Sequence, residues 1–165
     1  MMQNTLTVRT MKEEDWEAVQ TIYIKGIETG NATFETEAPS WEKWDIDHLQ
    51  FGRLVALQGN QIVGWVALSP YSSRPVYRGV AGVSIYIDPE FSGKKVGSSL
   101  MKNLIEECEK EGFWTLQSGI FPENQASLSL HQKFGFREVG RREKIGKLDG
   151  KWRDVLLLEK KLPSK

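Results

Sequence analysis

The hydrophobic and polar positions of this chain follow two different periods, and each period predicts a different kind of element. Short runs of β-branched and aromatic residues bounded by Gly, Pro, Asn or Asp predict strands. Apolar residues spaced three and four apart predict helices. We therefore expect seven strands, at residues 6–9, 54–58, 61–69, 83–87, 113–120, 136–145 and 152–162.

Four helices are expected between these strands. The first begins at Thr10-Met11-Lys12-Glu13, a capping box in which a hydroxyl and a carboxylate bind free N–H groups, and ends before Gly30. The second begins after Ser40, the third covers 96–111 and the fourth covers 125–134. The order βααβββαβαββ predicts an α/β fold, a mixed central sheet of about seven strands with helices on both faces.

The stretch V-S-I-Y-I-D-P-E-F-S-G-K-K-V-G-S-S, residues 83–99, combines a strand, a loop with Gly93 and Gly97, and the start of a helix. The first N–H groups of a helix have no intrahelical acceptor, and the helix dipole adds positive charge there. Lys94 and Lys95 add whole charges. The stretch therefore predicts a site for a phosphorylated ligand.

Glycine in such a loop is also common in ordinary connections between a strand and a helix, so this pattern has a purely structural alternative. The loop matches neither G-x-x-x-x-G-K-[ST] nor G-x-G-x-x-G, because Lys95 stands where the second pattern needs glycine. A P-loop and a dinucleotide-binding loop are thus excluded.

The composition narrows the possible partners. Lys plus Arg and Asp plus Glu number 22 each among 165 residues, a balance that argues against a nucleic-acid or anionic-membrane partner. No apolar run is long enough to span a bilayer, and the first residues lack the pattern of a signal peptide. We expect a cytoplasmic protein with a single domain over 1–165. The one cysteine, Cys108, lies among apolar helix positions, which favours inert packing over a nucleophile.

Polar residues form a line along the fourth predicted helix. Asn124, Ser127 and His131 are spaced i, i+3 and i+7, so their side chains share one face. Taken singly, they could be a helix cap, an exposed serine and a surface histidine.

Two loops carry further candidates. The polar loop N-A-T-F-E-T-E-A-P holds Phe34, and the loop P-Y-S-S-R-P-V-Y-R-G before the 83–87 strand holds Arg74, Tyr77 and Arg78. Core packing for the aromatic ring and solvation for the arginines are the simpler interpretations.

Several of these motifs resemble one known family. Residues 92–97 resemble motif A, [QR]-x-x-G-x-[GA], of the GCN5-related N-acetyltransferases (GNAT), although Ser92 and Lys95 depart from it. N-Q-A-S-L-S-L-H-Q-K-F-G-F resembles the second cofactor-binding helix of that family. N-A-T-F-E-T-E, R-P-V-Y-R and G-K-W-R-D-V are similar to segments of its phosphinothricin acetyltransferase branch.

The resemblance implies a site and a cofactor. It implies that strands four and five splay and admit acetyl-CoA, with no metal, and that the protein is a homodimer. Acetyl-CoA would be bound by Ile85, Tyr86 and Ile87 along the strand, by Gly93, Lys94, Lys95, Val96, Gly97 and Ser98 in the loop, and by Asn124 and Ser127. His131 would lie near the thioester sulfur, and Phe34, Glu35, Arg74, Tyr77 and Arg78 would border the acceptor pocket.

Two questions stay open from the sequence. If the backbone at Lys95 must have positive φ, lysine is strained at this position. If it need not, the Lys95 ammonium compensates for the motif arginine that Ser92 replaces. The phosphinothricin branch usually carries a glutamate where this chain has Gly82. Our hypothesis for the base that deprotonates the amine is Glu35, directly or through water; His131, or an amine that arrives neutral, are the alternatives. His131 also suits protonation of the departing CoA thiolate, because small shifts change its protonation near neutral pH.

Three functions remain compatible with the sequence. The first is an N-acetyltransferase for the primary amine of a small molecule, an amino acid or an analogue such as phosphinothricin or methionine sulfone, by direct transfer in a ternary complex. The second is a protein or peptide N-acetyltransferase. The third, motivated by Gly82, Ser92 and Lys95, is a CoA-binding module without turnover.

Overall fold

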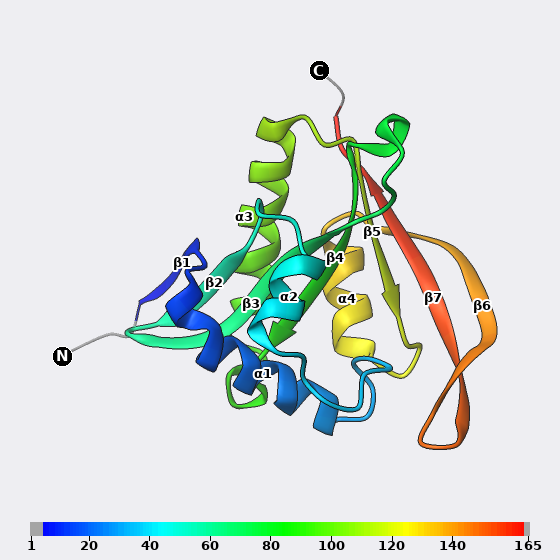
Figure 1. The fold of residues 1–165 in the computed structure, drawn as a ribbon, viewed down its shortest axis with the longest axis horizontal. Coiled ribbons are helices and arrows are strands. Elements are labelled where there is room, and N and C mark those ends of the chain that lie inside the picture. The colour runs from blue at the N-terminus through cyan, green and yellow to red at the C-terminus, as the bar shows by residue number, and fades with distance from the viewer. Residues whose placement is uncertain (1–4, 164–165) are drawn as a thin grey trace.

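The central feature of the fold is a seven-stranded sheet that runs between helices on its two faces (Figure 1). The computed structural model describes residues 5–163. The strands are β1 Leu6–Thr10, β2 Leu54–Gln58, β3 Gln61–Pro70, β4 Val80–Ile87, β5 Thr115–Ile120, β6 Arg137–Leu148 and β7 Lys151–Lys161. The helices are α1 Trp16–Glu28, α2 Trp41–Asp47, α3 Val96–Glu111 and α4 Gln125–Lys133. The predicted order of elements and the mixed α/β sheet are confirmed.

Alternating side chains send apolar residues to both faces of the sheet. On β3, Val66 belongs to the core under α3, whereas its neighbours Trp65 and Ala67 belong to the core under α1 and α2. A strand buried on both faces needs apolar residues at successive positions, which explains the nearly continuous apolar run of β3. Cys108 of α3 is fully buried in the first core, in agreement with a packing role.

The sheet order is β1-β2-β3-β4-β5-β7-β6, and one neighbouring pair, β4 and β5, is parallel. This pair is in register over three positions only, from Val80–Thr115 to Gly82–Gln117. Beyond Gly82 the two strands have no ladder, although β4 continues to Ile87 and β5 to Ile120. The carboxyl-terminal halves of the two strands therefore diverge, as the sequence resemblance implies.

The predicted capping box at residues 10–13 is wrong. Thr10 is the last residue of β1 and pairs with Leu54, and the helical segment begins only at Glu13, with Lys12 and not Thr10 as its N-cap. The chain instead enters a 3-10 turn at Glu13–Asp15, where the Asp15 carboxylate accepts the Lys12 N–H at 2.8 Å and a bidentate pair of bonds from Arg9. Strand pairing, which local motif reading ignores, decides this boundary. Ser40, in contrast, caps α2 as expected, because its hydroxyl accepts the Lys43 N–H.

Candidate active site

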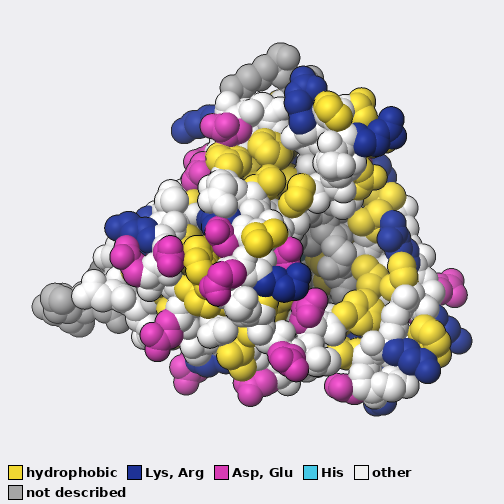
Figure 2. All heavy atoms as spheres, viewed as in Figure 1, with side chains coloured by type: hydrophobic (Ala, Val, Ile, Leu, Met, Phe, Trp, Pro, Cys, Tyr) yellow, Lys and Arg dark blue, Asp and Glu magenta, His cyan; other side chains and the backbone are white. Residues whose placement is uncertain are grey.

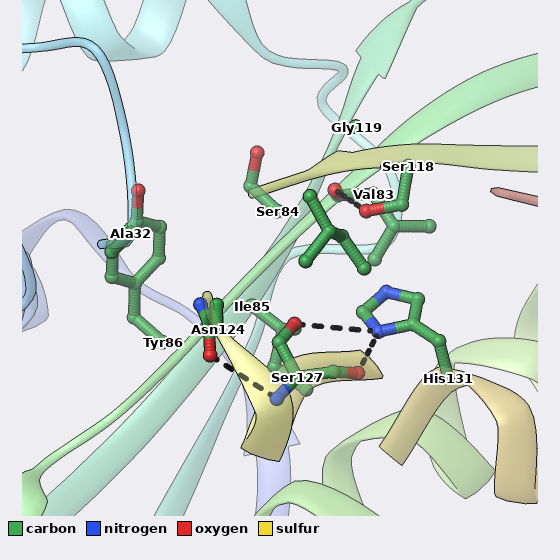
Figure 3. A pocket seen from close by; sticks show the side chains of 11 residues that line it. Ala32, Val83, Ser84, Ile85, Tyr86, Ser118, Gly119, Asn124, Ser127 and His131 are labelled. Carbon is green, nitrogen blue, oxygen red and sulfur yellow. Dashed lines mark hydrogen bonds between the residues drawn. The ribbon is translucent and has the colours of Figure 1, made fainter. Parts of the chain in front are cut away.

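A cavity of about 80 Å³ opens where β4 and β5 diverge. Figure 2 shows the molecule hollowed on this face, and Figure 3 shows the side chains around the cavity. Both strands, the α1–α2 loop and α4 contribute to its wall. The lining residues are Ala32, Val83, Ser84, Ile85, Tyr86, Ser118, Gly119, Ile120, Asn124, Ser127 and His131.

The polar line on α4 faces this cavity. Asn124 is the N-cap of α4, and its side-chain oxygen accepts the Ser127 N–H at 3.2 Å. One and two turns further, the side chains of Ser127 and His131 line the same cavity (Figure 3). The simpler interpretation of His131 as a surface residue does not hold, because only 1% of the residue is exposed.

The imidazole of His131 is held in a defined orientation. Its Nδ1 lies 2.7 Å from the Ser127 carbonyl oxygen, and a carbonyl can only accept, so Nδ1 carries the hydrogen. The neutral ring therefore presents a bare Nε2, which is buried and has no hydrogen-bond partner among residues 5–163. Burial lowers the pKa of His131 below its ordinary value of 6.5, so the ring is neutral at pH 7. The cavity thus contains a proton acceptor.

The open edge of β4 offers unpaired backbone groups. Residues 83–87 pair with β3 on one side, whereas the ladder to β5 ends at Gly82. The Ser118 hydroxyl donates a long hydrogen bond, 3.4 Å, to the Val83 carbonyl across the start of the gap. Ile85 and Tyr86 line the cavity, and Ile87 lies beyond it toward the start of α3. An extended, amide-containing ligand could pair with this edge as a strand would.

The start of α3 presents free N–H groups beside that edge. The first bond of the helix joins the Ser99 N–H to the Lys95 carbonyl, so the N–H groups of residues 96–98 precede it. Gly97 packs closely there, since a Cβ on it would lie 2.9 Å from Leu130 Cδ2. The Ser98 hydroxyl accepts a hydrogen bond from Lys133 Nζ at 2.9 Å. Together these groups form a positively polarised end that suits a phosphate.

The backbone of the preceding loop answers the question about Lys95. Gly93 has φ +77° and Lys95 has φ +66°, so the lysine does occupy the left-handed region that glycine prefers. Its side chain makes no capping hydrogen bond, and residues 92–95 are exposed. Lys95 therefore carries backbone strain. Lys94 is also exposed, and its ammonium lies over the Phe91 ring at 5.5 Å.

The predicted acceptor residues of the α1–α2 loop lie next to the cavity rather than in its wall. Phe34 is 37% exposed and packs edge-on against Phe121, with ring centroids 4.8 Å apart. Glu35 is exposed and raises the pKa of the nearby Tyr23, whose pKa burial raises most strongly. The residue of this loop that lines the cavity is Ala32, which the sequence does not mark, since alanine carries no functional group.

The loop with Arg74, Tyr77 and Arg78 lies at the other end of β4. The Arg74 guanidinium lies over the Tyr77 ring at 5.6 Å and that of Arg78 over the Trp114 ring at 5.5 Å. Arg78 precedes Val83, the first cavity residue of β4, by five positions, about 16 Å of extended chain. None of the three lines the cavity, and their contact with an acceptor stays a prediction.

Gly82 stands between that loop and the cavity. A Cβ built on it would meet a single heavy atom within 4 Å, the Ser69 carbonyl oxygen at 3.9 Å. The position therefore has room for a larger residue, and the absence of a carboxylate here is a matter of sequence, not of space.

The described residues contain neither a metal-binding cluster nor a membrane-spanning helix. Residues 5–163 contain no group of three or more His, Cys, Asp or Glu placed to hold a metal ion. No helix within that range combines the length and apolar character needed to cross a membrane.

The fold and the cleft define a GNAT-type α/β protein, and comparison with known proteins agrees. The model of the Acetyltransferase (GNAT) family matches residues 11–136. The phosphinothricin N-acetyltransferase of Streptomyces coelicolor is 31% identical over 94% of this chain and 95% of its own length. The L-amino acid N-acyltransferase MnaT of Escherichia coli is 30% identical over 66% of this chain and 63% of its own length.

A solved structure gives the same result. The GNAT superfamily phosphinothricin acetyltransferase of Sinorhizobium meliloti, crystallised in complex with AcCoA, has a TM-score of 0.85 and 28% identity, covering 96% of this chain and 89% of that one. The chain belongs to the Acetyltransferase (GNAT) family and is a transferase. The resemblance inferred from the motifs is confirmed.

Proposed function

We propose that the protein transfers an acetyl group from acetyl-CoA to the primary amine of a small molecule, an amino acid or an amino-acid analogue. One observation carries the proposal: the gap between β4 and β5 has an unpaired backbone edge on one side and the bare Nε2 of His131 on the other. The names of the relatives support the substrate class, since one acts on phosphinothricin and another on L-amino acids. The Sinorhizobium meliloti complex supports the cofactor.

The residues around the gap fit acetyl-CoA, which supplies an activated acetyl group when bound. The backbone of Ile85, Tyr86 and Ile87 can pair with the amide-bearing pantetheine arm, because that edge of β4 has no strand partner. The N–H groups of Val96, Gly97 and Ser98 suit the diphosphate, with Gly93, Lys94 and Lys95 forming the loop before them. Asn124 and Ser127 border the arm from α4.

His131 is our candidate for the base. An aliphatic amine has a pKa near 10, by analogy with lysine at about 10.4, so it must lose a proton before it attacks the acetyl carbonyl. The neutral Nε2 of His131 can accept that proton, directly or through water, and can then pass it to the departing sulfur. The exchange leaves the ring neutral again. Glu35 is the alternative, but it is exposed and does not line the cavity.

We infer direct transfer in a ternary complex. A covalent acetyl-enzyme would need an activated nucleophile, and the one cysteine, Cys108, is in the core, where burial raises its pKa to about 12. Initial rates measured against both substrates test this proposal. Intersecting double-reciprocal lines are the expected result, and parallel lines would contradict it.

Phe34, Glu35, Arg74, Tyr77 and Arg78 are proposed to meet the acceptor beyond the cavity. Arginine side chains suit the carboxylate or phosphinate that such an acceptor carries. If the two arginines bind it, Arg74→Gln and Arg78→Gln raise KM for the amine and leave KM for acetyl-CoA unchanged. Equal effects on both constants would remove them from the acceptor site.

The remaining proposals rest on the sequence pattern for the domain and the cytoplasm, and on the family resemblance for the dimer. We propose one N-acetyltransferase domain over 1–165 that acts in the cytoplasm as a homodimer. Sedimentation equilibrium tests the dimer, and a mass of one 18.8 kDa chain would contradict it.

The decisive assay follows thiol release from acetyl-CoA over a panel of amines. We expect release with free amino acids and analogues such as phosphinothricin or methionine sulfone, together with a product heavier by one acetyl group. Release only with peptides would favour the protein N-acetyltransferase function. Binding of CoA without release for any amine would favour a binding module and end the proposal.

A further inference from the structure

A side chain outside the predicted site joins the two segments that form one wall of the cavity. Arg153 of β7 donates hydrogen bonds to the Gly30 carbonyl and to Asn31 Oδ1, both at 2.8 Å, and to Glu123 Oε1 at 3.0 Å. Its guanidinium also lies 4.2 Å from the centre of the Phe121 ring. The side chain is only 14% exposed; its bonds to Gly30 and Asn31 are partly buried, whereas the bond to Glu123 is exposed to solvent.

The partners of Arg153 come from distant parts of the chain. Gly30 and Asn31 belong to the α1–α2 loop, whereas Phe121 and Glu123 belong to the turn between β5 and α4; Figure 1 shows the two segments side by side. Each segment contributes to the cavity next to its Arg153 contact. Ala32 follows Asn31 directly, and Ile120 and Asn124 flank the turn. Arg153 itself does not line the cavity.

We infer that Arg153 is a positioning residue that fixes the acceptor side of the cavity by holding the α1–α2 loop against the β5–α4 turn. The inference rests on the proposed acetyl transfer for its kinetic meaning. Arginine suits this place because its planar fork of donors can bind several acceptors at once, which the point charge of lysine cannot.

The α1–α2 loop has few other connections to the sheet. The Asn31 and Glu35 N–H groups bind the hydroxyls of Thr29 and Thr33 within the loop itself. The Thr33 hydroxyl also interacts with Tyr23 of α1 and Tyr86 of β4, where it opposes the burial that raises the pKa of both phenols. On the β6–β7 side, Phe34 packs on Phe121 and against Gly146, where a Cβ would lie 3.0 Å from its ring. On this side of the loop, the contacts of Phe34 would remain without Arg153.

The cofactor side has its own support. Asn124 is fixed by capping α4, and the β4 edge is fixed by its ladder with β3. Loss of Arg153 should therefore act on the amine and not on acetyl-CoA, which separates positioning of the acceptor wall from a general loss of structure.

Steady-state kinetics of Arg153→Met and Arg153→Lys test this separation. We expect KM for the amine to rise about tenfold in Arg153→Met, because the loss of one charge-assisted hydrogen bond changes a binding constant by about this factor. KM for acetyl-CoA should change less than about twofold. The Lys variant should recover only part of the loss. The matched control is Arg137→Met on the same hairpin, which breaks an exposed ion pair with Glu159 and should leave all constants unchanged.

A merely structural role predicts a different pattern. If Arg153 only stabilises the fold, Arg153→Met lowers kcat through the active fraction and leaves both KM values unchanged, and that result would overturn the inference.

Amide hydrogen exchange tests without any substrate whether Arg153 holds the α1–α2 loop against the β5–α4 turn, an arrangement that we call the clamp. The Asn31 and Glu35 amides should exchange faster in Arg153→Met than in the wild type, while Arg137→Met leaves them unchanged. Unchanged exchange in Arg153→Met would refute the clamp. If exchange accelerates but the wild type acetylates no amine, the clamp stands and the proposed function fails, so the two failures are distinguishable.

Discussion

The two walls of the β4–β5 cavity are built in different ways. The proposed cofactor wall consists mainly of backbone groups from continuous segments: the edge of β4, the first N–H groups of α3 and the cap of α4. The proposed acceptor wall, in which Ala32 lines the cavity, is held from behind by contacts among residues 30–34, 121–123 and 153, which come from three distant parts of the chain. A backbone wall tolerates changes of side chain as long as the chain path is kept, which explains how Ser92 and Lys95 can depart from motif A. A wall that depends on side-chain contacts does not tolerate such changes.

The largest expected effect comes from the residue between the two walls. His131→Gln should lower kcat/KM at least about 100-fold, the usual value of a positioned general base. Burial lowers the pKa of His131, so wild-type activity should fall as the pH drops below 6.5 through that lowered value, and the variant should lose this dependence. His48→Gln is the control, because His48 is half-buried and also has a lowered pKa, but it stacks on Trp44 and does not line the cavity. Equal losses in the two variants would show a packing effect only.

The next largest effect is expected at Gly82, where a carboxylate should make kcat/KM less dependent on His131. Adding Gly82→Glu to His131→Gln should recover about tenfold in kcat/KM, because a carboxylate at this open position can accept the proton of the amine. Gly82→Gln in the same background fills the space without a base and should recover nothing. Equal recovery with Glu and Gln would assign the gain to shape. Glu35→Gln alone should leave kcat/KM and its pH profile unchanged.

Smaller effects are expected at Lys95, where backbone strain should alter the free energy of unfolding and the side-chain charge should alter Kd for CoA. Lys95→Gly should raise the free energy of unfolding by about 0.5–1 kcal/mol, because the left-handed backbone no longer opposes a Cβ. It should also raise Kd for CoA by up to about fivefold through the lost exposed charge. Lys95→Asn tolerates positive φ without the charge and should weaken CoA binding equally. A gain in affinity in either variant would mean that the ammonium does not help.

The smallest effect concerns stability against pH. Burial lowers the pKa values of His48 and His131, so between those values and 6.5 the unfolded chain binds protons that the folded chain does not. Stability is therefore complete above 6.5 and falls as the pH drops below it. Urea unfolding of His131→Gln from pH 7 to pH 5 should show a shallower fall than the wild type. An identical slope would mean that folding does not lower the pKa of His131.

The local structure of the segments in the proposed cofactor wall could be predicted from the sequence because its signals are local, whereas their contact with acetyl-CoA stays a prediction. The run from β4 to α3, the α4 face and the Asp149-Gly150 turn, with φ +49° and +80°, are each encoded within a few neighbouring residues. The capping box at residues 10–13 failed where strand pairing competed with a local motif. The conformation of Lys95 was undetermined because loop closure, and not the lysine itself, sets its φ.

The acceptor wall could not be predicted in the same way. Ala32 and Arg153 are 121 positions apart and carry no motif of their own. Within G-K-W-R-D-V the arginine occupies a variable place of the resembling segment, so only its contacts with Gly30, Asn31 and Glu123 mark it.

The central claim is that the open β4 edge and the start of α3 bind acetyl-CoA through its pantetheine arm and diphosphate. Calorimetric titration of the purified protein with CoA and with pantetheine tests this claim most directly. The account predicts saturable binding of CoA at one site per chain, with Kd between about 1 μM and 1 mM, and much weaker binding of pantetheine, which lacks the diphosphate. Absence of CoA binding, or equal binding of the two compounds, would contradict it.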